Sequence, residues 1–419
     1  MRDGGIVSTA MEYRSPRSHV SEEQGQARAF AKVEIHRDAG PILTAWAELE
    51  AITPASIYQT RAFLLPWLET LGAARKVEPL FITAKDEQGR ILALLCLGIE
   101  RHGLLRKAVF LGGKESNFNL GLFRPGAGFA ATDVLALLQS AAKALGPEAP
   151  DVFLLKNQPF DWEGAPNPLA LLPHRPSPSF AYGTALTQNA GAFLASKLSK
   201  DARKKLRKKE TRLTNMAPVA LISNERESET RKILDVFFAE KVARCEEQAI
   251  DADFSSPAMR GFFDRLSRPR SDGQPWLKLY ALAVGGRIVA TYAGALHRGR
   301  FSAMVNSFDT DAEIAKSSPG DLLLMKLMAR QCETGVASFD LGIGEARYKA
   351  SYCDLTIPLF DVVVAFGVKG HVFAAYQALH SRLKRAVKQN PQVLATLRRW
   401  KRAAFGTRQS DTSGDEAKA

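Results

Sequence analysis

The order of strand-like and helix-like segments constrains the fold of this 419-residue chain most strongly, because one order occurs twice. Short apolar or alternating runs predict strands, and longer runs with apolar residues three and four apart predict helices. In the first half the predicted strands are 31–36, 80–86, 90–100, 108–111 and 151–156, and the predicted helices are 41–50, 59–71 and 131–145. In the second half the predicted strands are 218–223, 276–284, 287–297, 301–308 and 336–341, and the predicted helices are 227–244, 257–266 and 319–334. Both halves predict an α/β fold in which helices flank a mixed, mostly antiparallel sheet.

A chain of this length is expected to form two or three domains. Five prolines between Pro166 and Pro178 mark the predicted linker region. We therefore divide the chain into a disordered tail (1–30), a first domain (31–190), a second domain (191–370), and a basic helix followed by a disordered tail (371–419).

Composition excludes several classes of protein. The longest unbroken apolar stretch, Ile91–Ile99, is far shorter than the roughly 18–20 residues of a membrane span. Residues 1–29 lack the apolar core of a signal peptide, so we expect a cytoplasmic protein without a transmembrane segment. The four cysteines form no CxxC pair and the histidines no HxxxH motif, which predicts reduced thiols and no metal site.

The net charge of +13 is concentrated in two segments. Lys197–Arg212 carries nine basic and two acidic residues, and Arg382–Arg402 carries eight basic residues and no acidic one. The rest of the chain is close to neutral, so a surface that coats nucleic acid along its whole length is not expected.

Both basic segments have helical patterns. Apolar residues at helical spacing predict one amphipathic helix over Phe193–Leu213. Its basic face has three interpretations: a solvated surface, a site for an anionic partner such as a polysaccharide, lipid head groups or a nucleotide-linked sugar, or an RNA site. Few aromatic residues lie among its lysines, which disfavours nucleic acid. The second helix, Tyr376–Arg402, either docks on the domain or rests on an anionic membrane surface.

The segment 308–325 predicts an anion site at the start of a helix. Ser318 stands where a helix cap belongs, Pro319 suits the first helical position, and Gly320 allows close approach of a ligand. Free N–H groups and the positive end of the helix dipole attract phosphate oxygens there. Lys316 adds a cation next to Ser317, and Asp321 satisfies the dipole when no anion is bound. A well-capped helix with no ligand is the alternative.

A second motif follows in residues 336–352, where a strand ends near Asp340 and runs into a turn with Gly342 and Gly344. A dinucleotide fingerprint would need a third glycine, so that interpretation is excluded.

The residues Asn306–Asp309, Ser318–Leu323, Phe339–Gly342 and Arg347–Lys349 together resemble the GNAT-type acetyltransferase domain of CelD-type cellulose-biosynthesis proteins. They resemble more distantly the Fem aminoacyltransferases, which double the same fold. The resemblance covers about residues 191–368 and implies tandem GNAT-like domains, the second with a sheet splayed at its centre. It also implies an acyl-CoA co-substrate in the splay, with its pyrophosphate on the helix that begins at Pro319. The usual loop, Gln/Arg-x-x-Gly-x-Gly/Ala, is replaced by Lys316-Ser-Ser-Pro-Gly-Asp321.

The resemblance implies direct attack of an amine or hydroxyl on the thioester. Tyr348 is then the candidate acid for the leaving thiolate, and Asp340 and Glu345 are candidate bases if burial raises their pKa values. Lys349 is a candidate partner of a phosphate or of Asp340. The alternatives are a core aromatic for Tyr348, a turn cap for Asp340, a solvated loop carboxylate for Glu345 and a surface lysine for Lys349.

These features predict an acyl-CoA-dependent N- or O-acyltransferase, most simply an acetyltransferase, in exopolysaccharide or cell-envelope synthesis. A small molecule or a glycan is the expected acceptor, in a groove lined partly by the first half. The alternatives are a Fem-like aminoacyltransferase that uses aminoacyl-tRNA and a non-catalytic adaptor with a decayed GNAT fold.

Overall fold

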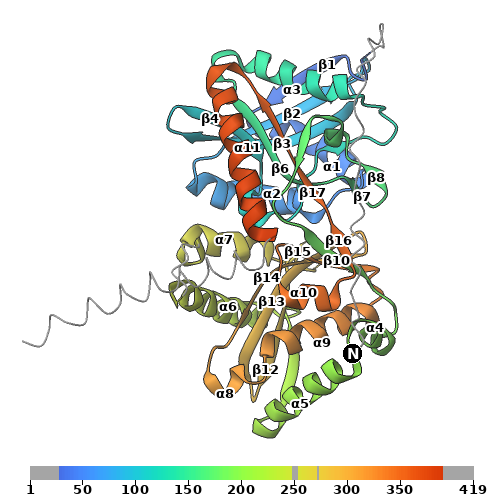
Figure 1. Cartoon of the computed structure of the whole chain (residues 1–419), viewed down its shortest axis with the longest axis vertical. Coiled ribbons are helices and arrows are strands. Elements are labelled where there is room, and N and C mark those ends of the chain that lie inside the picture. The colour runs from blue at the N-terminus through green and yellow to red at the C-terminus, as the bar shows by residue number, and fades with distance from the viewer. Residues whose placement is uncertain (1–27, 248–252, 271–272, 390–419) are drawn as a thin grey trace, which may run out of the picture.

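The computed structural model describes residues 28–247, 253–270 and 273–389. They form two mixed sheets with flanking helices, one above the other along the long axis of the molecule (Figure 1). The predicted α/β class with two sheets is confirmed. No helix of these residues is long and apolar enough to cross a membrane.

The first sheet has the strand order β1-β2-β3-β4-β6-β17-β9, with β5 paired to β3. Its strands are β1 Lys32–His36, β2 Glu78–Lys85, β3 Ile91–His102, β4 Leu105–Phe110, β5 Leu122–Phe123, β6 Val152–Pro159, β9 His174–Pro176 and β17 Leu359–Ala365. The helices around it are α1 Leu43–Ile52, α2 Arg61–Trp67, α3 Ala131–Leu145 and α11 Gly367–Gln389, and a small hairpin joins β7 Asp161–Trp162 to β8 Ala165–Pro166. Helix α3 packs on the sheet because Val134, Leu137, Leu138 and Ala141 lie on one helical face and are completely buried.

The second sheet has the order β11-β12-β13-β14-β15-β10-β16. Its strands are β10 Ala181–Ala185, β11 Val219–Ser223, β12 Lys278–Val284, β13 Arg287–His297, β14 Arg300–Phe308, β15 Ser338–Ile343 and β16 Leu355–Ile357. The helices of this half are α4 Ala190–Lys197, α5 Lys200–Met216, α6 Glu227–Glu247, α7 Pro257–Leu266, α8 Ala312–Ala315, α9 Pro319–Glu333 and α10 Arg347–Tyr352. Neighbouring strands are antiparallel except β14 and β15, which are parallel.

The two sheets exchange strands across the predicted domain limits. Strand β10 precedes residue 191 but lies in the second sheet, and β17 precedes residue 370 but lies in the first. The limits at residues 190 and 370 therefore remain predictions that the sheets do not follow. The proline-rich segment 166–178, predicted as a linker, contains β9, which pairs with β17 at the edge of the first sheet. An edge strand forms backbone hydrogen bonds to a neighbour on one side only, so it tolerates the missing N–H group of Pro176.

The single basic helix predicted over residues 193–213 is two helices. Helix α4 ends at Lys197, and Ser199 starts α5 by accepting a hydrogen bond from Ala202 N at 3.2 Å. Helix α11 begins at Gly367, before the predicted start at Tyr376, and its predicted continuation beyond Gln389 lies outside the described residues, as does most of the predicted tail 1–30.

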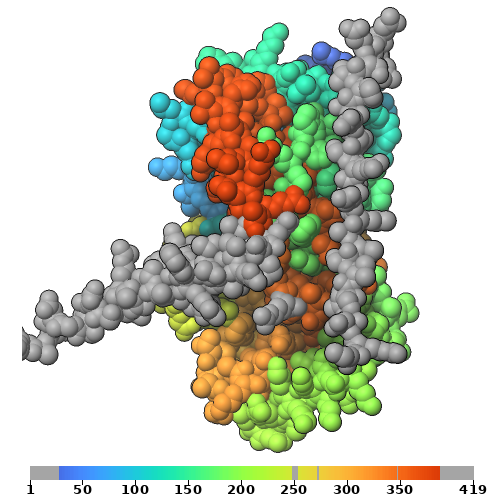
Figure 2. All heavy atoms as spheres, viewed as in Figure 1, coloured from blue at the N-terminus to red at the C-terminus, as the bar shows by residue number. Residues whose placement is uncertain are grey.

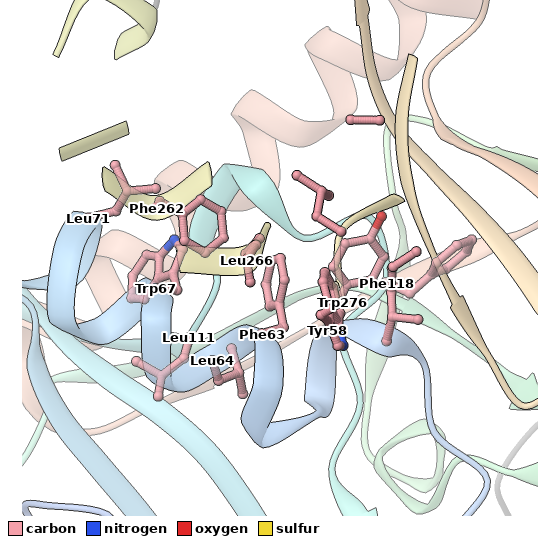
Figure 3. Close-up of a cluster of buried hydrophobic side chains, with 14 of the residues drawn as sticks. Tyr58, Phe63, Leu64, Trp67, Leu71, Leu111, Phe118, Phe262, Leu266 and Trp276 are labelled. Carbon is pink, nitrogen blue, oxygen red and sulfur yellow. The ribbon is translucent and has the colours of Figure 1, made fainter. Parts of the chain in front are cut away.

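One apolar core joins the two halves. Side chains of α2 and the π-helical turn Leu68–Gly72 point at side chains of α7 (Figure 3). The ring of Phe63 lies 5.4 Å from that of Phe262 and 5.6 Å from that of Trp276, and all three are buried. Arg75 also connects the halves through polar contacts. It forms ion pairs with Glu115 of the first half at 2.8 Å and with Asp253 of the second half at 2.7 Å. The halves therefore share a hydrophobic interior.

Candidate active site

Strands β14 and β15 separate at the centre of the second sheet. Their parallel pairing covers only residues 300–302 and 338–340, beyond which β14 pairs with β13 and β15 with β10. At the point of separation Asp340 is completely buried. Its Oδ2 accepts a hydrogen bond from Ser302 Oγ at 2.5 Å, and its Oδ1 accepts one from Gly342 N at 3.2 Å. Asp340 thus fixes both strands where the splay begins.

A side chain of the first half spans this splay. Asn117 Oδ1 accepts from Ile343 N at 3.2 Å, and Asn117 Nδ2 donates to Ala303 O at 3.5 Å and to the Tyr58 hydroxyl at 2.7 Å. Gly342 makes room for it, because a Cβ there would lie 2.3 Å from Asn117 Nδ2. Asn117 of the first half therefore links β14 to β15.

Sequence reasoning missed both Asn117 and Tyr58. They lie far along the chain from the motifs of the second half, and the only available signal was the glycine-rich stretch Gly112–Gly128 around Asn117.

Two ionisable groups at the splay have pKa values shifted toward neutrality. Burial raises the pKa of Asp340 to about 6, against the lowering effect of the Ser302 hydrogen bond. Burial lowers the pKa of Lys349 to about 8. Lys349 Nζ donates to Gly342 O at 3.2 Å and to Ile343 O at 2.9 Å, so this ammonium group holds the glycine turn.

The other candidate catalytic residues lie on either side of that turn. Tyr348 is half-buried and hydrogen-bonded to the buried Tyr292, and burial raises the pKa of Tyr348. A phenol with a raised pKa keeps its proton at neutral pH. Glu345 is exposed, and its Oε1 accepts from Phe180 N at 3.2 Å. The structure therefore brings Tyr348, Lys349 and Asp340 around one turn, with Glu345 at its surface.

The start of α9 differs in detail from the expected cap. Ser318 has a left-handed backbone (φ 47°), and its side chain makes no capping hydrogen bond. The reason is that Ser317 N and Ser318 N continue the turn of α8, so no extended residue precedes α9. Asp321 N and Leu322 N both donate to Ser318 O. Few backbone N–H groups are left for an anion, and Gly320 N is the one to consider.

The remaining residues of the predicted loop have varied surroundings. Lys316 is exposed and pairs with Glu313. Ser317 is completely buried, and its Oγ has no hydrogen-bond partner among residues 28–247, 253–270 and 273–389. Pro319 is buried, and Gly320 packs on Phe308, where an added Cβ would lie 3.3 Å from the ring. The small size of Gly320 therefore serves helix packing.

Helix α5 brings positive charge to the same place. Lys209 Nζ donates to Ser318 Oγ at 2.7 Å and lies 3.9 Å from the Asp321 carboxylate. Arg212 Nη1 donates to Lys316 O at 3.1 Å. Two cations and the helix dipole thus converge on the start of α9, next to the end of β14 (Figure 1).

The outer face of α5 is also basic. Its exposed basic residues that form no ion pair with another described residue are Lys200, Lys204, Lys205, Arg207, Lys208 and Arg212. By helical spacing, Lys204 and Arg207 lie on the far side of α5 from Lys209, whereas Lys205, four residues before Lys209, lies on the same side.

A cavity of about 320 Å³ lies beside the splay, between the two halves. Asn117 and Glu115 of the first half and Met304, Val305, Phe262 and Phe263 of the second half line it. Farther along β14, Ser307 Oγ donates a hydrogen bond to the half-buried carboxyl of Glu240, and desolvation raises the pKa of Glu240 to about 7. The part of the chain that the structure describes holds no group of three or more His, Cys, Asp or Glu residues able to bind a metal.

Comparisons with known proteins agree with this geometry. Residues 200–350 match the family model described as an acetyltransferase (GNAT) domain. Among solved structures, FemX has 11% identity and a TM-score of 0.52, over 79% of this chain and 97% of FemX. A conserved protein from Bacteroides thetaiotaomicron VPI-5482 has 15% identity and a TM-score of 0.49, over 80% of this chain and 100% of its own. A tandem GNAT protein from the clavulanic acid biosynthesis pathway has 11% identity and a TM-score of 0.45, over 80% and 99%.

At these identities a structural likeness shows the fold alone. Comparison with curated proteins finds no match for the chain. The predicted pair of mixed sheets flanked by helices is confirmed, and residues 200–350 of the second half match a GNAT domain model.

Proposed function

We propose that the protein is an acyl-CoA-dependent N- or O-acyltransferase, with an acetyl group as the simplest donor. In this proposal the thioester end of acyl-CoA lies in the splay near Asp340, and its pyrophosphate lies at the start of α9. The observation that carries the proposal is the placement of Lys209 and Arg212 on that helix start, at 2.7 Å from Ser318 Oγ and 3.1 Å from Lys316 O. Basic side chains and a helix N-terminus together favour phosphate oxygens.

The proposed reaction is direct transfer. An acceptor amine or hydroxyl attacks the thioester carbonyl, the C–S bond breaks, and the thiolate takes a proton from Tyr348, whose burial keeps that proton in place at neutral pH. Asp340 and Glu345 remain the proposed bases. Asp340 has the pKa suited to accept a proton near neutrality, and because both of its oxygens are hydrogen-bonded we assign the transfer to an intervening water.

The cavity of about 320 Å³ is the proposed acceptor site, and its Phe262, Phe263, Met304 and Val305 side chains make one wall apolar. A glycan or a small molecule of the exopolysaccharide or cell-envelope pathways remains the proposed acceptor, and the cytoplasm, where acyl-CoA is available, the proposed location.

Calorimetry with acetyl-CoA tests the donor. We expect Lys209→Ala to weaken binding roughly tenfold, because a charge-assisted hydrogen bond contributes about 1.5–3 kcal/mol. The matched control is Lys204→Ala on the same helix, which should bind as the wild type does because Lys204 makes no ion pair with a described residue. Absence of acetyl-CoA binding by the wild-type protein would refute the proposal.

A second candidate is a Fem-like aminoacyltransferase that uses aminoacyl-tRNA. The exposed basic row of α5, residues 204–208, favours it, and the chain shares the fold of FemX. This function predicts binding of charged tRNA that weakens steeply with salt, without binding of acetyl-CoA. The two candidates thus give opposite results in the same pair of titrations.

A further inference from the structure

Helix α11 has an apolar face that points away from the protein. Its inner face packs on β17 and β6, where Gly370 is so close to Asp151 O that an added Cβ would lie 2.0 Å from it. The outer face carries large apolar side chains with exposed fractions of 59–81%: Val368, Val372, Tyr376, Leu379 and Leu383. Steps of four, four, three and four residues place them on one side of a helix.

This concentration is unusual for the molecule. Among the residues that the structure describes, twelve large apolar side chains are exposed, and five of them lie on this one helix face. Of the other seven, Leu43 and Ile52 lie at opposite ends of α1, and the remaining five lie in separate segments. Helix α11 itself lies at the surface of the first half, in orange-red (Figure 2). A contiguous exposed apolar strip of this kind marks an interaction surface.

The charge of α11 indicates which kind of partner would bind the apolar strip. Gly367–Gln389 contains five basic residues and no acidic one. Lys369 and Arg382 are exposed on the two borders of the apolar strip, and neither forms an ion pair with another described residue. An apolar strip with basic borders matches a surface that is anionic outside and apolar inside.

The same charge argues against two occupants that this chain could supply. A second copy of α11 would bring five more basic residues and no acidic one against the first. The chain after Gln389 adds four basic residues up to Arg402 and no acidic one. In both cases like charges would meet around the strip.

We propose that the outer face of α11 docks the protein on an anionic lipid bilayer, with the helix parallel to the membrane surface. The apolar strip enters the boundary between head groups and acyl chains, and the basic borders contact lipid phosphates. The docking is peripheral and reversible, and it does not depend on the identity of the acyl donor.

Co-sedimentation of the full-length protein with vesicles tests this proposal. Vesicles of 30% phosphatidylglycerol in phosphatidylcholine are compared with pure phosphatidylcholine vesicles at 0.05 M and 0.3 M salt. We expect the wild type to partition at least tenfold more strongly onto the anionic vesicles, and less strongly at high salt because exposed charges are screened. The double variant L379Q/L383Q should lose at least tenfold in partitioning on the anionic vesicles.

The control is L104Q/L171Q, which removes two exposed leucines (84% and 51%) from elsewhere in the first half and should bind as the wild type does. All four side chains are more than half exposed, so both variants should fold, and a thermal melt checks that they do. Equal vesicle binding by wild type and L379Q/L383Q would overturn the proposal, since the basic residues alone would then explain binding. A wild-type dimer that L379Q/L383Q converts to a monomer would also overturn it, in favour of a second copy.

Discussion

In each of the two sheets a pair of parallel strands separates beyond a short contact, and different groups lie in the gap. Each contains one short parallel contact, over two residue pairs between β4 and β6 and over three between β14 and β15. Beyond the contact in the first sheet, Asn119 closes the gap, because its N donates to Asn157 O at 3.1 Å and its Nδ2 to Lys156 O at 2.9 Å. Beyond the contact in the second sheet, the Asn117 side chain reaches both strands at the splay. A bridging side chain can rotate away, whereas a backbone segment bonded to a strand cannot.

The helix starts that follow these contacts differ in charge. At α3, Asp133 accepts from Ala130 N at 2.9 Å and from Ala29 N at 3.2 Å, so a carboxylate of the chain itself occupies the positive end of the dipole. At α9, Lys209 and Arg212 add positive charge instead. The first turn of α9 also holds a carboxylate, Asp321, but Lys209 lies 3.9 Å from it, and under our proposal this helix start is better suited to an external anion than the start of α3.

The largest expected effect concerns the core that the halves share. Phe63→Ala removes a completely buried ring between α2 and α7 and should lower the free energy of unfolding by about 3–5 kcal/mol. Leu43→Ala, at a side chain that is 37% exposed, should cost less than about 1 kcal/mol. Urea unfolding measures both. If the two halves unfold independently, the urea unfolding curve of Phe63→Ala should instead show two transitions, one for each half.

The next effect is the pH dependence that Asp340 contributes. Its pKa rises from 3.8 in the unfolded chain to about 6 in the folded protein, so the folded state holds this proton more tightly. Its contribution to stability is therefore fully present below pH 3.8 and is lost as the pH rises through 6, by about 3 kcal/mol in total. The difference in unfolding free energy between wild type and Asp340→Asn, measured by urea titration from pH 4 to 7, should change by about 2.4 kcal/mol, which is most of this amount. A difference that stays constant with pH would show that Asp340 is not shifted.

A smaller effect tests the bridge across the splay. Gly342→Ala should destabilise the protein by about 1–3 kcal/mol, because Gly342 has a φ of +66° and the new Cβ would overlap Asn117. At Gly344, where φ is +103°, an added Cβ would have no other heavy atom within 4 Å. Gly344→Ala should therefore show only the free-energy cost of placing alanine in this backbone conformation. In the double variant Gly342→Ala/Asn117→Ala the overlap is removed, so the two substitutions should be non-additive. Strict additivity in thermal melts would place Asn117 away from the turn.

The smallest effect separates the two helix starts. Asp133→Ala removes the cap of α3 and should cost about 1 kcal/mol of stability, as lost caps usually do. Acetyl-CoA affinity should be unchanged, because α3 is not the proposed donor site. A loss of affinity in calorimetry, at unchanged melting behaviour, would assign the donor to the first half.

Local signals explain what the sequence predicted correctly. The limits of α3 and α7 agree with the predicted ones because both helices carry their signals nearby, an amphipathic face in α3 and Ser256 capping Met259 N in α7. The break at Ser199 was missed because Leu194, Leu198, Ala202 and Leu206 keep a helical spacing across it.

Long-range pairing explains what was missed. Strand β10 finds its partners β15 and β16 more than 150 residues later, and β17 finds β6 about 200 residues earlier. No local pattern encodes such pairings, and none encodes Asn117 or Tyr58 at the splay. The anion site at Pro319 stays a prediction from the sequence, and the positions of Lys209 and Arg212 beside it depend on how α5 packs on α9.

Hydrogen exchange measured with and without acetyl-CoA tests the central claim most directly, because it reports which helix start binds the donor. We predict slower exchange in peptides that cover residues 303–322 and 339–349, and unchanged exchange in peptides that cover residues 124–134 at the start of α3. Protection of residues 124–134, with none in the splay or at the start of α9, would contradict the account.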